Sequence, residues 1–207
     1  MNDTNDRRFG LKSGSVINDG RGRLFIISGP SGTGKTTLCS AVLNRFPDML
    51  YSVSYTTRKP RNGEQSGIDY YFIKKKDFKD KIEDGKWAEW AEVHGNYYGT
   101  RAELLDKELD SGRDIILDID VQGTIRLLKR YPESVAIFIM PPSIEELKRR
   151  LKLRNTDSGE VIAKRLENAK IEMAKKDLYL HVIINNQLPE AIEQLIAVIE
   201  SYRSTVS

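Results

Sequence analysis

The stretch from residue 24 to residue 43 constrains the fold of this chain more than any other. Residues 24–27 (LFII) form an apolar run that predicts a buried strand, and residues 37–43 (TLCSAVL) predict a helix. Between them, residues 29–36 (GPSGTGKT) fit the pattern G-x-x-x-x-G-K-S/T. In the order strand, glycine-rich loop and helix, this pattern is typical of a loop that binds phosphate.

The chemistry of such a loop follows from its residue types. Glycines allow consecutive backbone N–H groups to converge on phosphate oxygens, and the start of a helix adds a favourable dipole. Lys35 can neutralise the β- and γ-phosphates of a nucleotide, and the Thr36 hydroxyl is suitably placed to bind Mg²⁺. The alternative is a glycine-rich turn with a solvated lysine, and the complete motif in its strand–helix context argues against it.

The composition bounds the class of protein. Of 207 residues, 39% are hydrophobic and 30% are charged, which is typical of a soluble globular protein with one substantial core. A net charge of +3 gives no overall signal for nucleic-acid binding, so no nucleic-acid partner is expected. No apolar run approaches the roughly 20 residues that cross a bilayer, and no secretory segment is visible. We therefore expect a cytoplasmic protein without a membrane partner.

Cysteine and histidine are scarce. Cys39 is the single cysteine, which excludes an intrachain disulfide and predicts a small core residue. With His94 and His181 as the two histidines, the chain cannot assemble a zinc site of the usual kind.

Short apolar strands alternate with helices over much of the chain. After residues 1–22, which we expect to be a loosely ordered extension, further strands are predicted at 114–120, 135–140 and 181–185, each followed by a helix. Ser143, with Glu146 three residues later, predicts the start of one of these helices. The alternation predicts an α/β fold with a parallel sheet covered on both faces.

Residues 50–100 have a different character and are interpreted as an inserted lobe. They are polar and rich in aromatic and β-branched residues. Strands are expected at 51–57, 69–73 and 87–93, a helix at 76–84 and a turn at 95–100.

Two acids end a predicted buried strand. Asp118 and Asp120 lie at the carboxyl end, where open parallel sheets bind ligands. One acid there is expected to support the water shell of Mg²⁺ beside a phosphate-binding loop. Capping of the following helix is the alternative for either residue.

Arginines gather in two groups. Arg58 and Arg61 lie in the inserted lobe with Tyr70 and Tyr98, and Arg150, Arg154 and Arg165 flank the loop at 154–159. Arginine pairs bidentately with phosphate, and tyrosine hydroxyls can donate to the same oxygens. Surface salt bridges are the alternative for any single arginine. Two groups on either side of a phosphate-binding loop suit two phosphorylated ligands that meet head to head.

Several segments together resemble the guanylate kinases. Residues 54–70 are similar to the acceptor-binding signature of that family, and residues 95–100 (GNYYGT) and 117–123 (LDIDVQG) match further family motifs. The glycine-rich loop and the pattern of Arg150, Arg154 and Arg165 match as well. The resemblance spans about residues 23–200.

The resemblance implies the fold and its division. It implies an α/β P-loop fold with a parallel five-stranded sheet flanked by helices, an inserted mixed α/β GMP-binding lobe and a helical lid. The core would comprise residues 23–50, 101–140 and 178–207, the GMP-binding lobe residues 51–100, and the lid residues 145–170, all within a domain of residues 23–207.

The resemblance also implies a role for individual residues. The guanine contacts would be Ser54, Glu89 and Asp120, and the remaining GMP contacts Arg58, Arg61, Tyr70, Tyr98 and Thr100. The ATP contacts would be Gly29, Pro30, Ser31, Gly32, Thr33, Gly34, Lys35, Thr36, Thr37 and Asn185. The catalytic residues would be Lys35, Arg150, Arg154 and Arg165. Mg²⁺ would be held by Thr36 and, through water, by Asp118.

The reaction implied is ATP + GMP ⇌ ADP + GDP, with dGMP as a further acceptor and with the protein a monomer or homodimer. Two other readings stay open at this point. Guanylate-kinase-like scaffold domains keep the fold but bind proteins, and their phosphate loops are typically degraded, whereas this loop is intact. A P-loop kinase for another small acceptor is the second alternative, and the signature at 54–70 argues against it.

Overall fold

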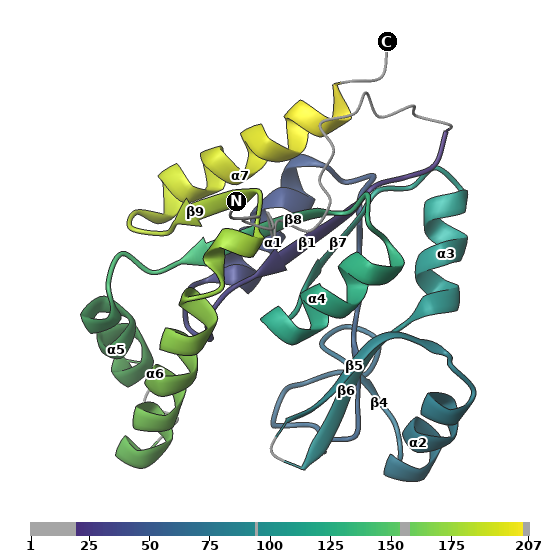
Figure 1. The fold of residues 1–207 in the computed structure, drawn as a ribbon, viewed down its shortest axis with the longest axis horizontal. Helices are drawn as coiled ribbons and strands as arrows, with labels where there is room; N and C mark the ends of the chain where they lie inside the picture. Colours follow the sequence, from purple (N-terminus) through teal and green to yellow (C-terminus); the bar gives the residue numbers. More distant parts are fainter. Residues whose placement is uncertain (1–19, 94, 154–157, 205–207) are drawn as a thin grey trace, which may run out of the picture.

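A parallel five-stranded sheet forms the centre of the structure, a computed structural model that describes residues 20–93, 95–153 and 158–204 (Figure 1). Its strands stand in the order β2-β7-β1-β8-β9. The strands are β1 (Leu24–Ser28), β2 (Leu50–Tyr51), β7 (Ile115–Asp118), β8 (Val135–Met140) and β9 (His181–Ile184). The predicted parallel sheet is confirmed, and β1 is its middle strand.

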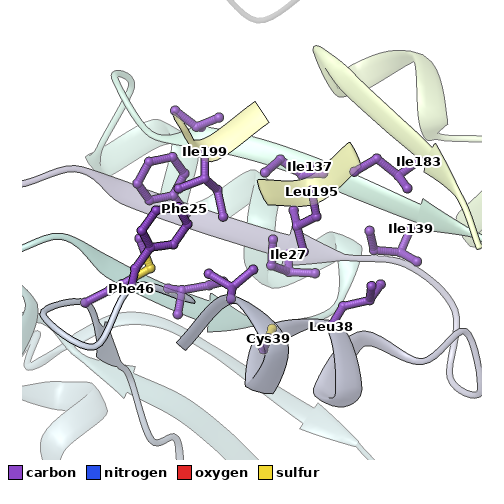
Figure 2. Close-up of a cluster of buried hydrophobic side chains, with 14 of the residues drawn as sticks. Phe25, Ile27, Leu38, Cys39, Phe46, Ile137, Ile139, Ile183, Leu195 and Ile199 are labelled. Carbon is purple, nitrogen blue, oxygen red and sulfur yellow. The ribbon is translucent and has the colours of Figure 1, made fainter. Parts of the chain in front are cut away.

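Helices cover both faces of this main sheet because β1 is apolar on both sides. Phe25 and Ile27 face a buried cluster with α1 (Lys35–Arg45) and α7 (Leu188–Arg203), whose labelled side chains interlock in Figure 2. Leu24 and Ile26 alternate with them and face α3 (Ala102–Asp110) and α4 (Val121–Arg130). Cys39 lies within the first cluster with 1% of its surface exposed, so the prediction of a core cysteine is confirmed.

A second, smaller sheet forms from residues 55–101. Its order is β4-β3-β6-β5, and all its neighbours are antiparallel except β3 and β4. Its elements are β3 (Tyr55–Thr56), β4 (Tyr71–Phe72), α2 (Lys75–Glu83), β5 (Trp87–Val93) and β6 (Asn96–Arg101). Phe78 of α2 stacks on Trp87 with ring centroids 4.1 Å apart, which gives this small sheet a core of its own.

Two sequence expectations are wrong in this region. Residues 51–57 are not one strand, because Tyr51 pairs with Ile116 in the main sheet while Tyr55 and Thr56 pair in the small sheet. Residues 95–100 are not a turn, because residues 96–101 pair with β5 as a full strand. The glycine in that strand suggested a turn, but a Cβ on Gly99 would lie 2.9 Å from the ring of Phe78, so glycine serves close packing there.

Helices α5 (Ile144–Leu153) and α6 (Gly159–Met173) pack on each other through Leu147, Leu151 and Ile162. Together they extend from the main sheet on the same side as the small sheet (Figure 1). The Ser143 hydroxyl accepts from the Glu146 N–H at 3.1 Å, which confirms the predicted helix start. A 3-10 turn, η1 (Lys176–Leu178), leads from α6 to β9. None of the helices described is both long and apolar enough to cross a bilayer.

Candidate active site

The glycine-rich loop joins the middle strand to α1, as its motif predicts. Gly29 and Gly34 have φ values of 136° and 91°, which side-chain-bearing residues rarely adopt. A Cβ on Gly29 would lie 2.2 Å from the Ile139 carbonyl oxygen, and one on Gly34 would lie 2.7 Å from the Asn185 amide nitrogen. The loop therefore needs glycine at these positions for both its backbone conformation and its packing.

Lys35 folds back over the loop. Its ammonium donates to the carbonyl oxygens of Gly29 at 2.7 Å and Pro30 at 3.1 Å. Burial lowers the pKa of Lys35, while Asp118, Glu172 and Asp120 each act to raise it. The ammonium is thus a partly desolvated cation beside three acids, in a loop whose backbone suits an anion.

Glu172 is a residue that the sequence reasoning missed. It lies near the end of α6, and burial raises its pKa, while Lys35 acts to lower it. It lines a pocket with Asp120, the second of the two acids that the sequence placed at the end of a buried strand. One signal could have found it, since Glu172 follows Arg165 by seven residues, two helical turns on the same face.

Asp118 is the last residue of β7 and pairs with Ile27 of β1, two residues before the glycine-rich loop. One carboxylate oxygen is 3.5 Å from the Thr36 hydroxyl, and the other accepts a hydrogen bond from the Tyr51 hydroxyl. Burial, with Asp118 second, raises the pKa of Tyr51, so the tyrosine remains the donor.

The residues here fit Mg²⁺. Thr36 and Asp118 offer the oxygen ligands that it prefers. In the part of the chain that the structure describes, no group of three or more His, Cys, Asp or Glu side chains could hold a metal. Mg²⁺ binds few protein ligands and takes the rest from phosphates and water.

Glu89 and Asp120 come together at the start of α4. Asp120 accepts from the Gly123 N–H at 2.7 Å, so it caps the helix, as the alternative interpretation held. Glu89 on β5 is 6% exposed and accepts from the hydroxyl of Thr100, its cross-strand neighbour, at 2.8 Å. A Cβ on Gly123 would lie 2.9 Å from one Glu89 oxygen and 3.3 Å from Asp120. Burial raises the pKa of Glu89 to about 7, and Asp120 adds to the effect.

Arg58 is held in place by several groups of the small sheet. Its guanidinium donates to both carboxylate oxygens of Glu64, at 2.9 and 2.8 Å, and lies 5.3 Å from the centre of the Tyr70 ring. Tyr70 in turn contacts Tyr98 edge to face, with 6.0 Å between ring centroids. Glu64 also accepts from the backbone N–H of Arg61 at 2.7 Å. Glu64 stands within the family signature, but sequence reasoning assigned it no role in the site.

Two other residues predicted to contact GMP are less closely held. The Arg61 side chain is exposed, and Ser54 is half-buried immediately before β3. Burial, and secondly the charge of Asp118, raise the pKa of Tyr70.

Arg150 and Asn185 brace the loop from α5 and the end of β9. The buried Asn185 amide donates to the Thr33 carbonyl at 2.8 Å, and its own backbone carbonyl accepts from Arg150 at 2.9 Å. Arg150 also pairs with Glu146 at 2.8 Å. Arg165 is half-buried on α6, and Arg154 lies outside the described residues.

Comparisons with known proteins agree on one family. The sequence model of the guanylate kinase family matches residues 21–202. The guanylate kinase of Syntrophotalea carbinolica is 49% identical over 178 residues, 86% of this chain and 85% of that protein. The guanylate kinase of Geobacter metallireducens is 50% identical over 182 residues, 88% of this chain and 90% of that protein.

The architecture gives the same result. The crystal structure of guanylate kinase from Anaplasma phagocytophilum superimposes with a TM-score of 0.72 at 32% identity, covering 88% of this chain and 86% of that one. The fold that matches carries a glycine-rich loop after the middle strand, two acids at the end of the neighbouring strand and an arginine beside two tyrosines. The chain belongs to the guanylate kinase family.

Proposed function

We propose that this member of the family transfers the γ-phosphoryl group of ATP to GMP, and to dGMP, by in-line displacement with Mg²⁺. One observation carries the proposal beyond family membership. The buried Glu89 and the helix-capping Asp120 converge on Gly123, beside the carboxyl end of the strand next to the phosphate-binding loop. This supports a base-recognition site beside a phosphate-binding site, at the carboxyl edge of the main sheet.

Carboxylates at this point favour guanine. Its Watson–Crick edge carries N–H donors at N1 and N2, and the carboxylates of Glu89 and Asp120 accept hydrogen bonds from them. Adenine has an acceptor at N1, which would face a carboxylate lone pair. Sites that match buried polar groups in this way can reject the mismatched substrate by about 10⁴-fold. Ser54 completes the base contacts, and Thr100 makes a further contact to GMP outside the base.

The GMP phosphate takes the second part of the acceptor site. Arg58, Arg61, Tyr70 and Tyr98 supply its donors. Arg58 is already oriented by Glu64 and by the Tyr70 ring, so little side-chain freedom is lost when phosphate binds.

The loop of residues 29–37 binds the ATP phosphates, with Asn185 behind it. Thr36 would hold Mg²⁺ directly and Asp118 through water. When bound, Mg²⁺ supplies positive charge that neutralises the donor phosphate oxygens.

Catalysis then depends on alignment and charge. The GMP phosphate is already an anionic nucleophile at neutral pH, so no strong general base is needed. Lys35, Arg150, Arg154 and Arg165 stabilise the transferring phosphoryl group. The lid at about 145–170 and the GMP-binding lobe at about 51–100 close on the core so that water does not compete with GMP. We place the protein in the cytoplasm, as a monomer or homodimer, with the nucleotides as partners.

A coupled assay of ADP release tests this function. Purified protein is offered ATP and Mg²⁺ with GMP, dGMP, AMP or CMP. Turnover with GMP and dGMP, and none with AMP or CMP, is the expected result. Turnover with AMP alone would replace guanylate kinase activity with another nucleotide kinase activity. Absence of turnover with all four would favour a scaffold role.

A further inference from the structure

The two oxygens of the Asp118 carboxylate have different partners. One accepts from the Tyr51 hydroxyl, and the other lies 3.5 Å from the Thr36 hydroxyl. The first contact therefore leaves the second oxygen directed toward the start of α1.

The sheet register explains how Tyr51 reaches this carboxylate. Tyr51 pairs with Ile116 on the parallel strand β7. Ile116 and Asp118 are two residues apart on that strand, so their side chains lie on the same face. Tyr51 packs beside the cluster that includes Ile116, on the face covered by α1. The ring is thus fixed by packing, with its hydroxyl at the end of β7.

We propose that Tyr51 is a positioning residue that holds the Asp118 carboxylate by one oxygen so that the other faces Thr36 and the Mg²⁺ water shell. The inference rests on the proposed function, in which Asp118 supports Mg²⁺. Groups that hydrogen-bond to a metal's own ligands typically change metal affinity about 10- to 100-fold when removed. Because Asp118 acts through water, the effect of Tyr51 is expected at the lower end of this range. Without the hydroxyl, the carboxylate can rotate about its last torsion, and its free oxygen is no longer held in one direction.

The test removes only the hydroxyl, with the substitution Tyr51→Phe. Binding of ADP is measured by calorimetry without Mg²⁺ and over a series of Mg²⁺ concentrations, and steady-state rates are measured over the same series. ADP affinity without Mg²⁺ should be unchanged. The Mg²⁺ concentration that gives half of the maximal change in ADP affinity, and in rate, should rise roughly 10-fold. The turnover number should recover at saturating Mg²⁺.

The chain offers a matched control. The Tyr131 hydroxyl donates to Asp106 at 2.9 Å, a tyrosine–aspartate pair between α3 and the end of α4. Tyr131→Phe loses the same kind of bond outside the site, so its Mg²⁺ dependence should equal that of the wild type. Tyr51→Leu should lower the melting temperature through lost packing and still show the same Mg²⁺ shift as Tyr51→Phe.

Asp118→Asn separates this inference from the proposed function. If Asp118→Asn leaves the Mg²⁺ dependence unchanged, the metal role of Asp118 in the proposed function is wrong. If Asp118→Asn weakens Mg²⁺ binding while Tyr51→Phe behaves like Tyr131→Phe, the positioning role of Tyr51 is wrong. A Mg²⁺ shift in Tyr51→Leu but not in Tyr51→Phe would assign the effect to packing and also overturn the role.

Discussion

Glu89 is a carboxyl group whose charged form is destabilised by burial in the folded protein. It is buried against α4 with Asp120 close by, and it accepts a hydrogen bond from the Thr100 hydroxyl. Guanine would bring two further donors to the same acids. Buried acids with few hydrogen-bond donors favour a ligand that supplies donors, so the burial of Glu89 contributes to selectivity for guanine.

The raised pKa of Glu89 makes GMP binding depend on pH. With a pKa of about 7, Glu89 in the free protein is protonated below neutrality and must lose its proton to accept from guanine. GMP affinity should fall about tenfold for each pH unit below 7. Calorimetric titration with GMP from pH 5.5 to 8.5 measures the dependence. The GMP phosphate also titrates in this range, so Glu89→Gln, which keeps only that contribution, is the control. Equal pH profiles for the two proteins would contradict the prediction.

The same group should reduce the stability of the fold at higher pH. The native state binds the Glu89 proton more tightly than the unfolded state, whose carboxyl titrates near 4.5. The free energy of unfolding should therefore fall by up to about 3 kcal/mol as pH rises from 4.5 through 7. In Glu89→Gln this loss disappears. Urea unfolding of both proteins at pH 4.5 and pH 8 checks it, and a difference between the proteins that is the same at both pH values would refute it.

At the scale of elements, the phosphate-binding loop is braced from the far end of the sequence. The Asn185 amide donates to the Thr33 carbonyl across 152 residues of chain. Its position at the end of β9, next to β8, brings it behind the loop. This hydrogen bond therefore restrains the backbone conformation of the glycine-rich loop.

Removing this brace should loosen the loop. Asn185→Ala leaves the Thr33 carbonyl buried and unpaired, which costs about 1–3 kcal/mol. The KM for ATP should rise about tenfold while the KM for GMP changes little, and the melting temperature should fall. Steady-state kinetics with each nucleotide varied in turn measures this. Asn186→Ala, at the exposed neighbouring position, should resemble the wild type, and equal effects of the two substitutions would count against the brace.

Sequence reasoning succeeded where a function is written in contiguous residues. The glycine-rich loop and the apolar strands are local patterns, so a parallel sheet could be predicted from the residues, whereas the number of five strands was implied by the family resemblance. The contacts of Asn185 and Tyr51 could not, because their partners are 152 and 67 residues away. Glycine misled at residue 99, where close packing and not chain reversal requires it. The strand at 51–57 was misread because periodicity cannot tell which of two sheets a residue joins.

At the scale of the whole molecule, two bodies extend from one side of the main sheet. One body is the small sheet, and the other is α5 with α6 (Figure 1). Arg58 follows β3 of the small sheet, and Arg150 lies on α5. Both arginines are now neutralised by acids of their own segment, Glu64 and Glu146. In the proposed mechanism, phosphate oxygens would replace these carboxylates when the two bodies close on the nucleotides, and the acids would keep the arginines oriented between turnovers.

If Arg150 acts as proposed, its substitution should affect mainly turnover. Arg150→Ala should lower kcat by about 10²- to 10³-fold, the range for a lost transition-state donor. Arg149→Ala is the matched control, because Arg149 pairs with the same Glu146 at 2.7 Å but is exposed on α5. Rapid-quench and steady-state kinetics compare the two. Near wild-type turnover in Arg150→Ala would be inconsistent with a catalytic role for that residue.

The central position of β1 also has a consequence for how the chain matures on the ribosome. Ile27 finds its strand neighbours at Asp118 and at Ile137. Contacts so distant in sequence form slowly and only after the intervening chain exists. A nascent chain that stops before residue 137 has made the whole glycine-rich motif yet lacks one wall of its strand. Nucleotide binding should thus begin late in synthesis, and the emerging N-terminal half would expose an unpaired apolar strand until residues 135–140 are made.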